Sequence, residues 1–242
     1  MIKTVISRAA LERELKSAAT PERATGAAKY FKTGEGEYGA GDVFLGVTVP
    51  AMRKIALRYR DLKLDDLQRL LDSKVHEHRA AALEILVSQY KRGDEKTRQQ
   101  IFDLYLRNTK CVNNWDLVDA SCRGIVGEHL RTRPRKVLDK LARSKSLWER
   151  RIAMVSTMPL VWGGETDDAL RIAELLLDDA HDLIHKAVGW LLREVGDEDQ
   201  AALVGFLKKH YERVPRTALR YAIEHFPMEQ RKQMLKGEFV LR

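Results

Sequence analysis

Residues 111–122, CVNNWDLVDASC, place a tryptophan and an acid at a spacing that suits a positively charged ligand. If this segment is helical, Trp115 and Asp119 lie one turn apart on the same face. A carboxylate and an aromatic face both attract cations. The alternative is that Trp115 is a core aromatic and Asp119 a solvated helix residue. Asn114 or Asp116 would then cap the helix.

The apolar stripe of this segment favours a ligand at the tryptophan. The stripe residues recur at helical spacing, and they are Leu117, Ala120, Ile125 and either Val118 or Cys122. Trp115 and Asp119 fall largely off this stripe. We therefore expect a ligand or another chain to cover the tryptophan face.

A second tryptophan, Trp190, follows Lys186 by one turn in KAVGWLLREVG. Gly189 precedes it, although glycine within a helix costs roughly 1 kcal/mol relative to alanine. Either another group approaches the backbone here, or Gly189 permits close helix packing and Trp190 belongs to the core. The sequence leaves both interpretations open.

Other catalytic chemistries have little support in the sequence. The seven histidines form no HExxH motif, and His181 and His185 have no evident third ligand, so we expect no metal. Cys111 and Cys122 stand in no CxxC motif, and we interpret both as small buried residues without a disulfide. Nucleophile-elbow and dinucleotide fingerprints are missing, and we expect no cofactor.

The composition is that of a soluble protein, and its excess of basic residues is compatible with a polyanionic partner. The 242 residues are 44% hydrophobic and 32% charged, and the net charge is +8. No apolar run approaches the ~18 residues of a membrane span, and the first residues lack a signal core. We therefore predict a cytoplasmic protein without a membrane partner.

Nearly every segment shows the three- and four-residue spacing of amphipathic helices. The clearest predicted helices are residues 76–92, 167–180 and 182–195. The predicted apolar stripe of 76–92 is Ala80, Leu83, Val87 and Tyr90, and that of 182–195 is Ile184, Val188, Leu191, Leu192 and Val195. Breaks are predicted at residues 92–94, 131–134, 158–165, 195–199 and 226–227. Residues 33–42 are predicted to form a surface loop, and 41–50 a loop of extended character.

The helices also recur with a period of roughly 30 to 40 residues. The recurring blocks are EHRAAALEIL from Glu77, ERRIAMVSTM from Glu149, HKAVGWLLRE from His185 and PRTALRYAIE from Pro215. This recurrence predicts an all-α fold, a HEAT-like helical-repeat solenoid with a concave basic groove. We expect one domain over residues 1–242, with a capping helix in 1–24 and repeats over 25–230.

Corresponding positions of stacked helix pairs should face that groove. In this alignment they are Arg79, Trp115, Asp116, Asp119, Arg150, Arg151, Lys186, Trp190, Arg216 and Arg220. Arg150 and Arg151 lie about 100° apart on a helix, and the repeat alignment favours Arg151 as the inward residue. Trp148, just before them, is expected to face the core. The cations suit a phosphate backbone, to which they give affinity without sequence preference.

Four blocks in this order resemble the AlkD-like DNA alkylation repair family. They are KYFKTGEGEYGAGDVFLGVTVPAMRKIA (29–56), NNWDLVDASCRGIVGEHL (113–130), SLWERRIAMV (146–155) and HKAVGWLLREVG (185–196). The resemblance runs from about residue 25 to about residue 230. It implies HEAT-like repeats and a DNA glycosylase that excises cationic alkylated purines, such as 3-methyladenine and 7-methylguanine, from duplex DNA.

The resemblance also implies site residues. The family has two groove tryptophans, an aspartate four residues after the first, and an arginine. These match Trp115, Trp190, Asp119 and Arg151, with Arg150 as the alternative arginine. Asn114 stands where the family has an aromatic residue. We expect Arg79, Arg150, Lys186, Arg216 and Arg220 to contact DNA, and the protein to act as a monomer. We also expect it to associate with the nucleoid when it is bound to DNA.

An alkylated purine cation needs no protonation before it leaves, so one carboxylate suffices. Asp119 would stabilise the oxocarbenium-like sugar, and the tryptophans would attract the lesion. The alternative function is a non-enzymatic HEAT-type scaffold that binds branched or distorted DNA, RNA or a protein partner. Asp119 distinguishes the two, because an acid in a pure phosphate-binding groove would repel the backbone.

Overall fold

The computed structural model describes residues 6–239, and helices make up most of these residues. In the first half of the chain the helices are α1 (Arg8–Ser17), α2 (Pro21–Tyr30), α3 (Val49–Arg58), α4 (Leu64–Leu71), α5 (His76–Arg92), α6 (Glu95–Arg107), a 3-10 turn (Thr109–Cys111) and α7 (Trp115–Cys122). The second half has α8 (Glu128–Leu130), α9 (Lys136–Ala142), α10 (Leu147–Val155), α11 (Met158–Val161), α12 (Asp167–Leu176), α13 (Asp182–Glu198), α14 (Gln200–His210), α15 (Arg216–Ala222) and α16 (Met228–Met234). A π-helical segment, Arg123–Gly127, stands between α7 and α8.

Within residues 6–239, β structure is limited to one parallel bridge between Val43 and Val75. The predicted all-α class is therefore confirmed. Residues 1–5 of the expected capping helix lie outside the described part of the chain, and the rest of that segment contains α1 and the beginning of α2. No helix in the described part combines the length and the apolar character that a bilayer crossing requires.

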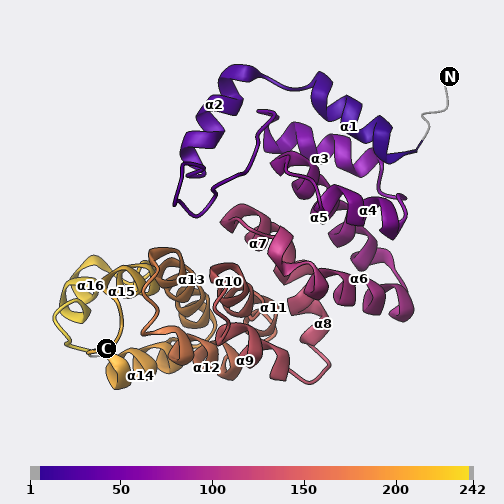
Figure 1. Cartoon of the computed structure of the whole chain (residues 1–242). Coiled ribbons are helices and arrows are strands. Elements are labelled where there is room, and N and C mark those ends of the chain that lie inside the picture. The colour runs from indigo at the N-terminus through magenta and orange to yellow at the C-terminus, as the bar shows by residue number, and fades with distance from the viewer. Residues whose placement is uncertain (1–5, 240–242) are drawn as a thin grey trace. The chain divides into compact units, whose positions relative to one another are not determined.

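The chain divides into two compact units, Met1–Ile125 and Val126–Arg242. In the first unit, α5 packs against α3, α4, α6 and α7 (Figure 1). The predicted stripe of α5 is only part of what it buries. Leu83 and Tyr90 are buried as expected, whereas Ala80 and Val87 are only half-buried. Ile85 and Leu86, which are not part of the predicted stripe, are buried as well. A helix with neighbours on several sides loses the one-sided pattern that periodicity detects.

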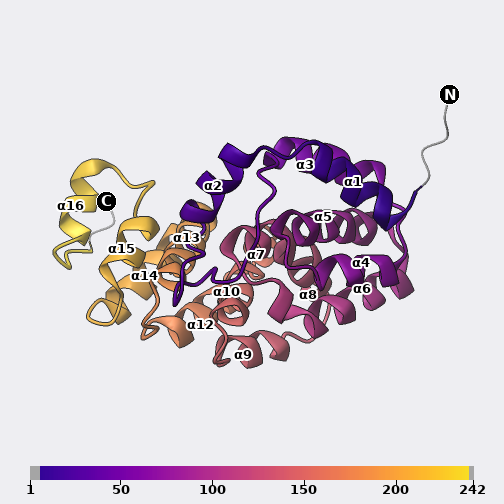
Figure 2. The same cartoon turned by 45° about the horizontal axis from the view of Figure 1, so that its top comes forward.

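In the second unit, α13 packs against α10, α12, α14 and α15 (Figure 2). Its whole predicted stripe is buried, namely Ile184, Val188, Leu191, Leu192 and Val195. Trp148 of α10 is only 8% exposed, which confirms its predicted place in the core.

Gly189 lies where α13 approaches α15. A Cβ atom at this position would stand 2.5 Å from the Ala218 carbonyl oxygen and 2.6 Å from the Tyr221 Cβ. Of the two interpretations that the sequence left open, close helix packing therefore accounts for this glycine. Trp190 itself stays half-buried and is not part of the closed core.

Gly189→Ala is expected to lower the free energy of unfolding by roughly 1–2 kcal/mol. The overlap with α15 outweighs the gain in helix propensity. The matched control is Gly205→Ala in α14, where a Cβ meets nothing within 4 Å. That change should stabilise the protein by up to about 1 kcal/mol. Urea unfolding of both variants measures the difference, and equal shifts in both would contradict the packing argument.

Helix boundaries differ from the prediction at two places. Residues 158–165 were predicted as a break, but Met158–Val161 form α11, with Pro159 early in the helix where its missing N–H is tolerated. The chain turns only after Trp162, where Gly164 has a φ of +82°. At residues 195–199, α13 continues through Glu198 before Asp199 caps the next helix.

A recurring contact marks the start of three helices. Arg79, the fourth residue of α5, donates from Nη1 to the carbonyl oxygen of Ser73 at 2.7 Å. Arg150 of α10 does the same to the carbonyl of Ser144 at 3.0 Å. In α13, the Nε2 atom of His185 makes the equivalent contact with the Asp179 carbonyl. The structural repeat thus aligns Arg79 with Arg150, so the predicted alignment with Arg151 is wrong by one residue.

The two cysteines are separate thiols. Cys122, at the end of α7, is fully buried, and Cys111 in the 3-10 turn is half-buried. Burial raises the pKa of the Cys111 thiol, and the Asp72 carboxylate adds to that effect. The prediction of buried residues is therefore confirmed for Cys122 and only partly for Cys111.

Candidate functional site

A cavity of about 430 Å³ lies in the first unit, and Trp115 and Asp119 both line it. Its walls come from α2, α3, α5, α7 and the segment between α2 and α3. The polar and aromatic lining residues are Arg23, Phe31, Phe44, Thr48, Arg53, His76, Glu77, Glu84, Trp115, Asp116, Asp119 and Arg123.

Helix α7 positions both residues, because Trp115 is its first residue and Asp119 follows one turn later. Asn114 caps the helix, and its side-chain oxygen accepts a hydrogen bond from the Trp115 N–H at 2.9 Å. Leu117 and Val118 are buried, whereas Trp115 and Asp119 are half-buried. Ala120, expected on the buried stripe, is instead exposed along the cavity wall.

Aromatic rings fix the orientation of the Trp115 side chain. The Phe31 ring centre lies 5.4 Å from that of Trp115, and Tyr30 meets Trp115 edge to face at 6.0 Å. Phe31 also stacks on Phe44 at 5.2 Å. Phe44 in turn stacks on His76 with ring centres 4.5 Å apart. Sequence analysis found Trp115 but missed this support, because the rings come from separate parts of the chain.

Below these rings lies an ion cluster of Asp42, His76, Arg79 and Asp116. His76 contacts Asp42 Oδ2 through Nδ1 at 3.1 Å and Asp116 Oδ2 through Nε2 at 2.8 Å. Each ring nitrogen of His76 thus lies within hydrogen-bond distance of a carboxylate oxygen, an arrangement that favours the protonated imidazole. Arg79 Nη2 lies 2.7 Å from the same Asp42 oxygen. Asp42, His76 and Arg79 side chains are each only 4% exposed.

The partners in this cluster control two pKa values. Burial alone would lower the pKa of His76, but hydrogen bonds to Asp116 and Asp42 outweigh it and raise that pKa. Burial would raise the pKa of Asp42, but the His76 hydrogen bond and the Arg79 charge lower it overall. The cluster thus holds charged groups inside the unit and ties the start of α5 to the start of α7.

Protein stability is therefore expected to fall as pH rises above 6.5, the ordinary pKa of histidine. Because the folded pKa of His76 is raised, the folded state keeps a proton that the unfolded state has released. The contribution is complete below pH 6.5 and is lost as pH passes the raised pKa. Urea unfolding between pH 6.5 and about pH 9, below the lysine range, measures this slope.

His76→Gln is the matched variant for this slope. It keeps a polar side chain that does not titrate, so the free energy of unfolding should change less with pH over the same range. His78, His181 and His210 have pKa values lowered mainly by burial, and they titrate below this range. An identical slope in the variant and the wild type would contradict the assignment.

A buried carboxylate also shapes the mouth of the cavity. Glu77, 4% exposed, accepts hydrogen bonds from the backbone N–H groups of Leu45, Gly46 and Val47 at distances from 2.8 to 3.2 Å. Gly46 has a φ of +80°, and a Cβ there would overlap the backbone of Thr20 at the start of α2. The segment between α2 and α3 is thereby held so that Phe44 reaches the cavity.

Several predicted DNA-binding cations have internal partners. Arg79 is only 3% exposed and belongs to the ion cluster, so its prediction as a surface contact is wrong. Arg150 pairs with Asp179 at 2.5 Å. Arg151 is 5% exposed and donates to the Leu183 carbonyl. It therefore contacts the first turn of α13 and is not exposed at the surface.

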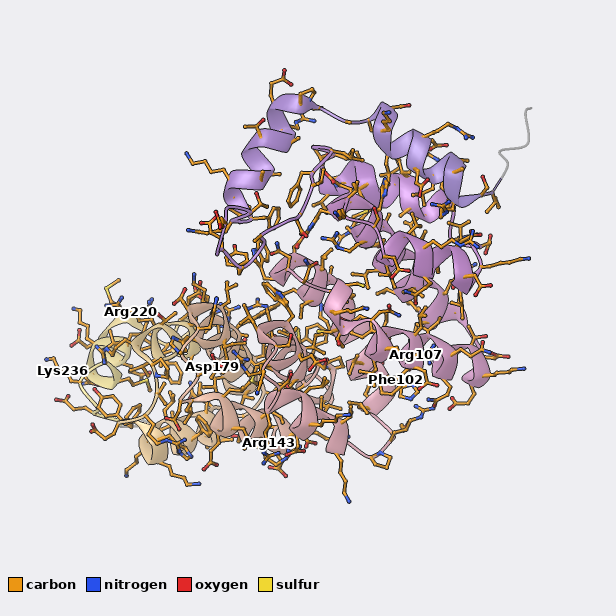
Figure 3. All side chains as sticks on the ribbon, in the orientation of Figure 1. Phe102, Arg107, Arg143, Asp179, Arg220 and Lys236 are labelled. Atoms are coloured by element: carbon orange, nitrogen blue, oxygen red, sulfur yellow. The ribbon has the colours of Figure 1, made fainter. Side chains whose placement is uncertain are left out.

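The remaining cations lie in the second unit. Lys186 pairs with Asp182 one turn earlier at 2.8 Å. Arg220 is exposed on α15 (Figure 3). Arg216 of the same helix is also exposed and donates to the Leu235 carbonyl. In the first unit, the cavity has cations that sequence analysis missed, namely Arg23, Arg53 and Arg123.

Trp190 shares a carboxylate with another tryptophan of the second unit. Its Nε1 donates to Glu194 Oε1 at 3.0 Å. Trp162, which is 53% exposed, donates from Nε1 to Glu194 Oε2 at 3.0 Å. Sequence analysis overlooked Glu194, although it follows Trp190 by the same four residues that separate Asp119 from Trp115.

Across residues 6–239, no three histidine, cysteine or acidic side chains cluster in a way that could hold a metal ion.

Comparison with known proteins identifies relatives of this chain. A family model described as DNA alkylation repair enzyme matches residues 11–226. A solved structure, the predicted DNA alkylation repair enzyme from Enterococcus faecalis, has a similar fold with a TM-score of 0.69. That similarity covers 87% of this chain and 97% of the other, at 17% sequence identity. Among curated proteins, none matches the chain.

Proposed function

Since the chain belongs to the DNA alkylation repair enzyme family, we propose that it is a DNA glycosylase for cationic alkylated purines such as 3-methyladenine and 7-methylguanine. The observation that carries the proposal is the shared wall of Trp115 and Asp119 in the cavity of the first unit. A half-exposed ring and a half-exposed carboxylate there can meet a cationic substrate without unfolding any element.

The reaction breaks the bond between the sugar C1′ and the purine nitrogen. The bonding electron pair leaves with the base and neutralises its positive charge, so no acid is needed. Positive charge then develops on the sugar, where the Asp119 carboxylate stabilises it. Asp119 also orients the water that adds to C1′ and accepts its proton.

Substrate binding would divide between aromatic rings and cations. The face of Trp115 would attract the alkylated nucleotide by roughly 0.5–2 kcal/mol per contact. Trp190, in the second unit, stays a predicted site residue. Arg23, Arg53 and Arg123 line the cavity and would hold flanking phosphates. Arg216 and Arg220 are exposed and would add contacts from the second unit.

The decisive assay uses duplex DNA treated with a methylating agent. Incubation with the protein should release 7-methylguanine or 3-methyladenine as free base and leave abasic sites, which alkali converts into strand breaks. Untreated duplex should give no breaks. Binding to branched or distorted DNA without any base release would instead support the non-enzymatic scaffold and overturn the proposal.

A further inference from the structure

The start of α7 is attached to the rest of the first unit at two points. Asn113, just before the helix, donates from Nδ2 to Asp42 Oδ1 at 3.0 Å. Asp116, in the first turn, has its Oδ2 atom 2.8 Å from His76 Nε2, and His76 Nδ1 lies 3.1 Å from Asp42 Oδ2. These contacts lie on both sides of Asn114, the residue that caps the helix, so they fix the place where α7 begins.

This part of α7 also carries the candidate residues of the cavity. Trp115 is the first residue of the helix, and Asp116 and Asp119 lie one turn apart and both line the cavity. A change in the contact between Asp116 and His76 should therefore displace the Asp119 carboxylate as well. Reaction rates depend steeply on such placement, since a displacement of about 1 Å can cost roughly 100-fold.

His76 is linked to the same place by a stack of rings. Its ring centre lies 4.5 Å from that of Phe44 and 5.2 Å from that of Phe31. Phe31 in turn lies 5.4 Å from Trp115. Because the His76 side chain is only 4% exposed, it is enclosed by these neighbours. His76 thus reaches the cavity wall both through a hydrogen bond to Asp116 and through aromatic contacts.

The double contact of His76 depends on its charge. A neutral imidazole has one donor nitrogen, and only the protonated ring can donate to Asp42 and Asp116 at once. The charged groups that influence His76 are Asp116 from α7, Asp42 from the segment between α2 and α3, and Arg79 from α5 itself. Burial lowers the pKa of His76, but the two carboxylates outweigh burial and the Arg79 charge and raise it overall. Loss of the proton removes one of the two hydrogen bonds.

We propose that His76 is a positioning residue for base release, which in its protonated form holds the start of α7, with Trp115 and Asp119, in the orientation that the reaction requires. The inference rests on the proposed function, because it concerns the placement of the carboxylate that stabilises the sugar. His76 acts through Asp116 and through the ring stack, and it takes no part in breaking the bond.

The first test compares His76→Gln with His78→Gln, the same change two residues later, outside the cavity lining. Base release from methylated duplex is measured with saturating enzyme in a single turnover, and circular dichroism checks that each variant is folded. At pH 6.5, the ordinary pKa of histidine, His76→Gln should lower the rate by roughly 10- to 100-fold. His78→Gln should behave as wild type. An unchanged rate in folded His76→Gln would overturn the inference.

The pH dependence separates positioning from a merely structural role. The ratio of the wild-type rate to the His76→Gln rate cancels any titration of the substrate itself. This ratio should fall as pH rises through the titration of His76, followed by nuclear magnetic resonance of its ring, because the neutral ring loses the hydrogen bond that the variant lacks. A ratio that stays constant across that titration would overturn the inference.

Asp116→Asn tests the same contact from the other side. The amide oxygen still accepts a hydrogen bond from His76, but the charge that favours the protonated ring is gone. The decline of the wild-type rate with pH should therefore move to lower pH in this variant. A decline at the same pH as in the wild type would contradict the inference.

Nuclear magnetic resonance of the indole N–H groups tests the positioning without any DNA. The signal of Trp115, assigned with Trp115→Phe, should move with pH along the titration of His76 and should not do so in His76→Gln. The signals of Trp148, Trp162 and Trp190 belong to the second unit and should not follow it. A Trp115 signal that ignores the titration would overturn the inference while wild-type base release still upheld the proposed function. A wild-type protein that releases no base would overturn both.

Discussion

Asp119→Asn is expected to lower the single-turnover rate of 7-methylguanine release by roughly 100- to 1000-fold. The substitution keeps the size of the side chain but removes the negative charge beside the sugar, where positive charge develops. Asp119 is half-buried on the cavity wall, so the fold should tolerate the neutral amide. Binding of methylated duplex should be retained or slightly strengthened, because one charge that repels phosphates is gone.

The matched control is Asp65→Asn in the first turn of α4, an exposed position away from the cavity lining. It should release base at the wild-type rate. Rates are measured with enzyme in excess over methylated duplex, so that product release does not limit them. Unchanged release by Asp119→Asn would remove this residue from the chemistry, whatever the wild type does.

Glu77→Ala is expected to lower the free energy of unfolding by about 3–5 kcal/mol. The change leaves the N–H groups of Leu45, Gly46 and Val47 without their acceptor, and each buried unsatisfied donor costs about 1–3 kcal/mol. Because Leu45 is only half-buried, water can replace part of its lost bond. Chemical unfolding monitored by circular dichroism measures the loss.

Glu84→Ala on the same helix provides the comparison. Glu84 pairs with Arg53, whose side chain is 51% exposed, and such pairs contribute at most about 1 kcal/mol. A similar loss in both variants would show that Glu77 contributes only as an ordinary helix residue. Glu77→Ala should also weaken base release at temperatures where it stays folded, since Phe44 would no longer be held in the cavity wall.

The fold could be predicted from the sequence where one helix face is buried. The stripe of α13 is regular, and all five of its predicted residues are buried. The pattern of α5 was harder to interpret because that helix has neighbours on several sides. The predicted break at residues 158–165 failed for a local reason, since proline is tolerated in the first turn of a short helix.

The candidate site was predictable only where its residues are close in the chain. Trp115 and Asp119 share one helical turn, so their spacing alone indicated a common face. The ion cluster joins Asp42, His76 and Asp116, which are distant in sequence and come together only through packing. Arg79 was misassigned because a basic residue shows its charge in the sequence but not its burial.

The repeat alignment shows a similar limit. Because the repeat pattern is degenerate, Arg150 and Arg151 can each be aligned with Arg79, and residue type alone does not decide between them. The contact with a backbone carbonyl six residues earlier does separate them, and it assigns Arg150 to the position of Arg79. Backbone contacts of this kind leave no signal in residue type, since histidine replaces arginine at the third occurrence.

The burial of the cysteines has a consequence for a protein that works amid electrophiles. Reagents that methylate purines also attack thiolates, the reactive form of cysteine. Cys122 is fully enclosed, and the raised pKa of Cys111 keeps that thiol protonated at neutral pH. The chain has only these two cysteines. Under methylating stress the protein should therefore gain few methyl adducts on its thiols while the DNA of the cell accumulates methylated bases.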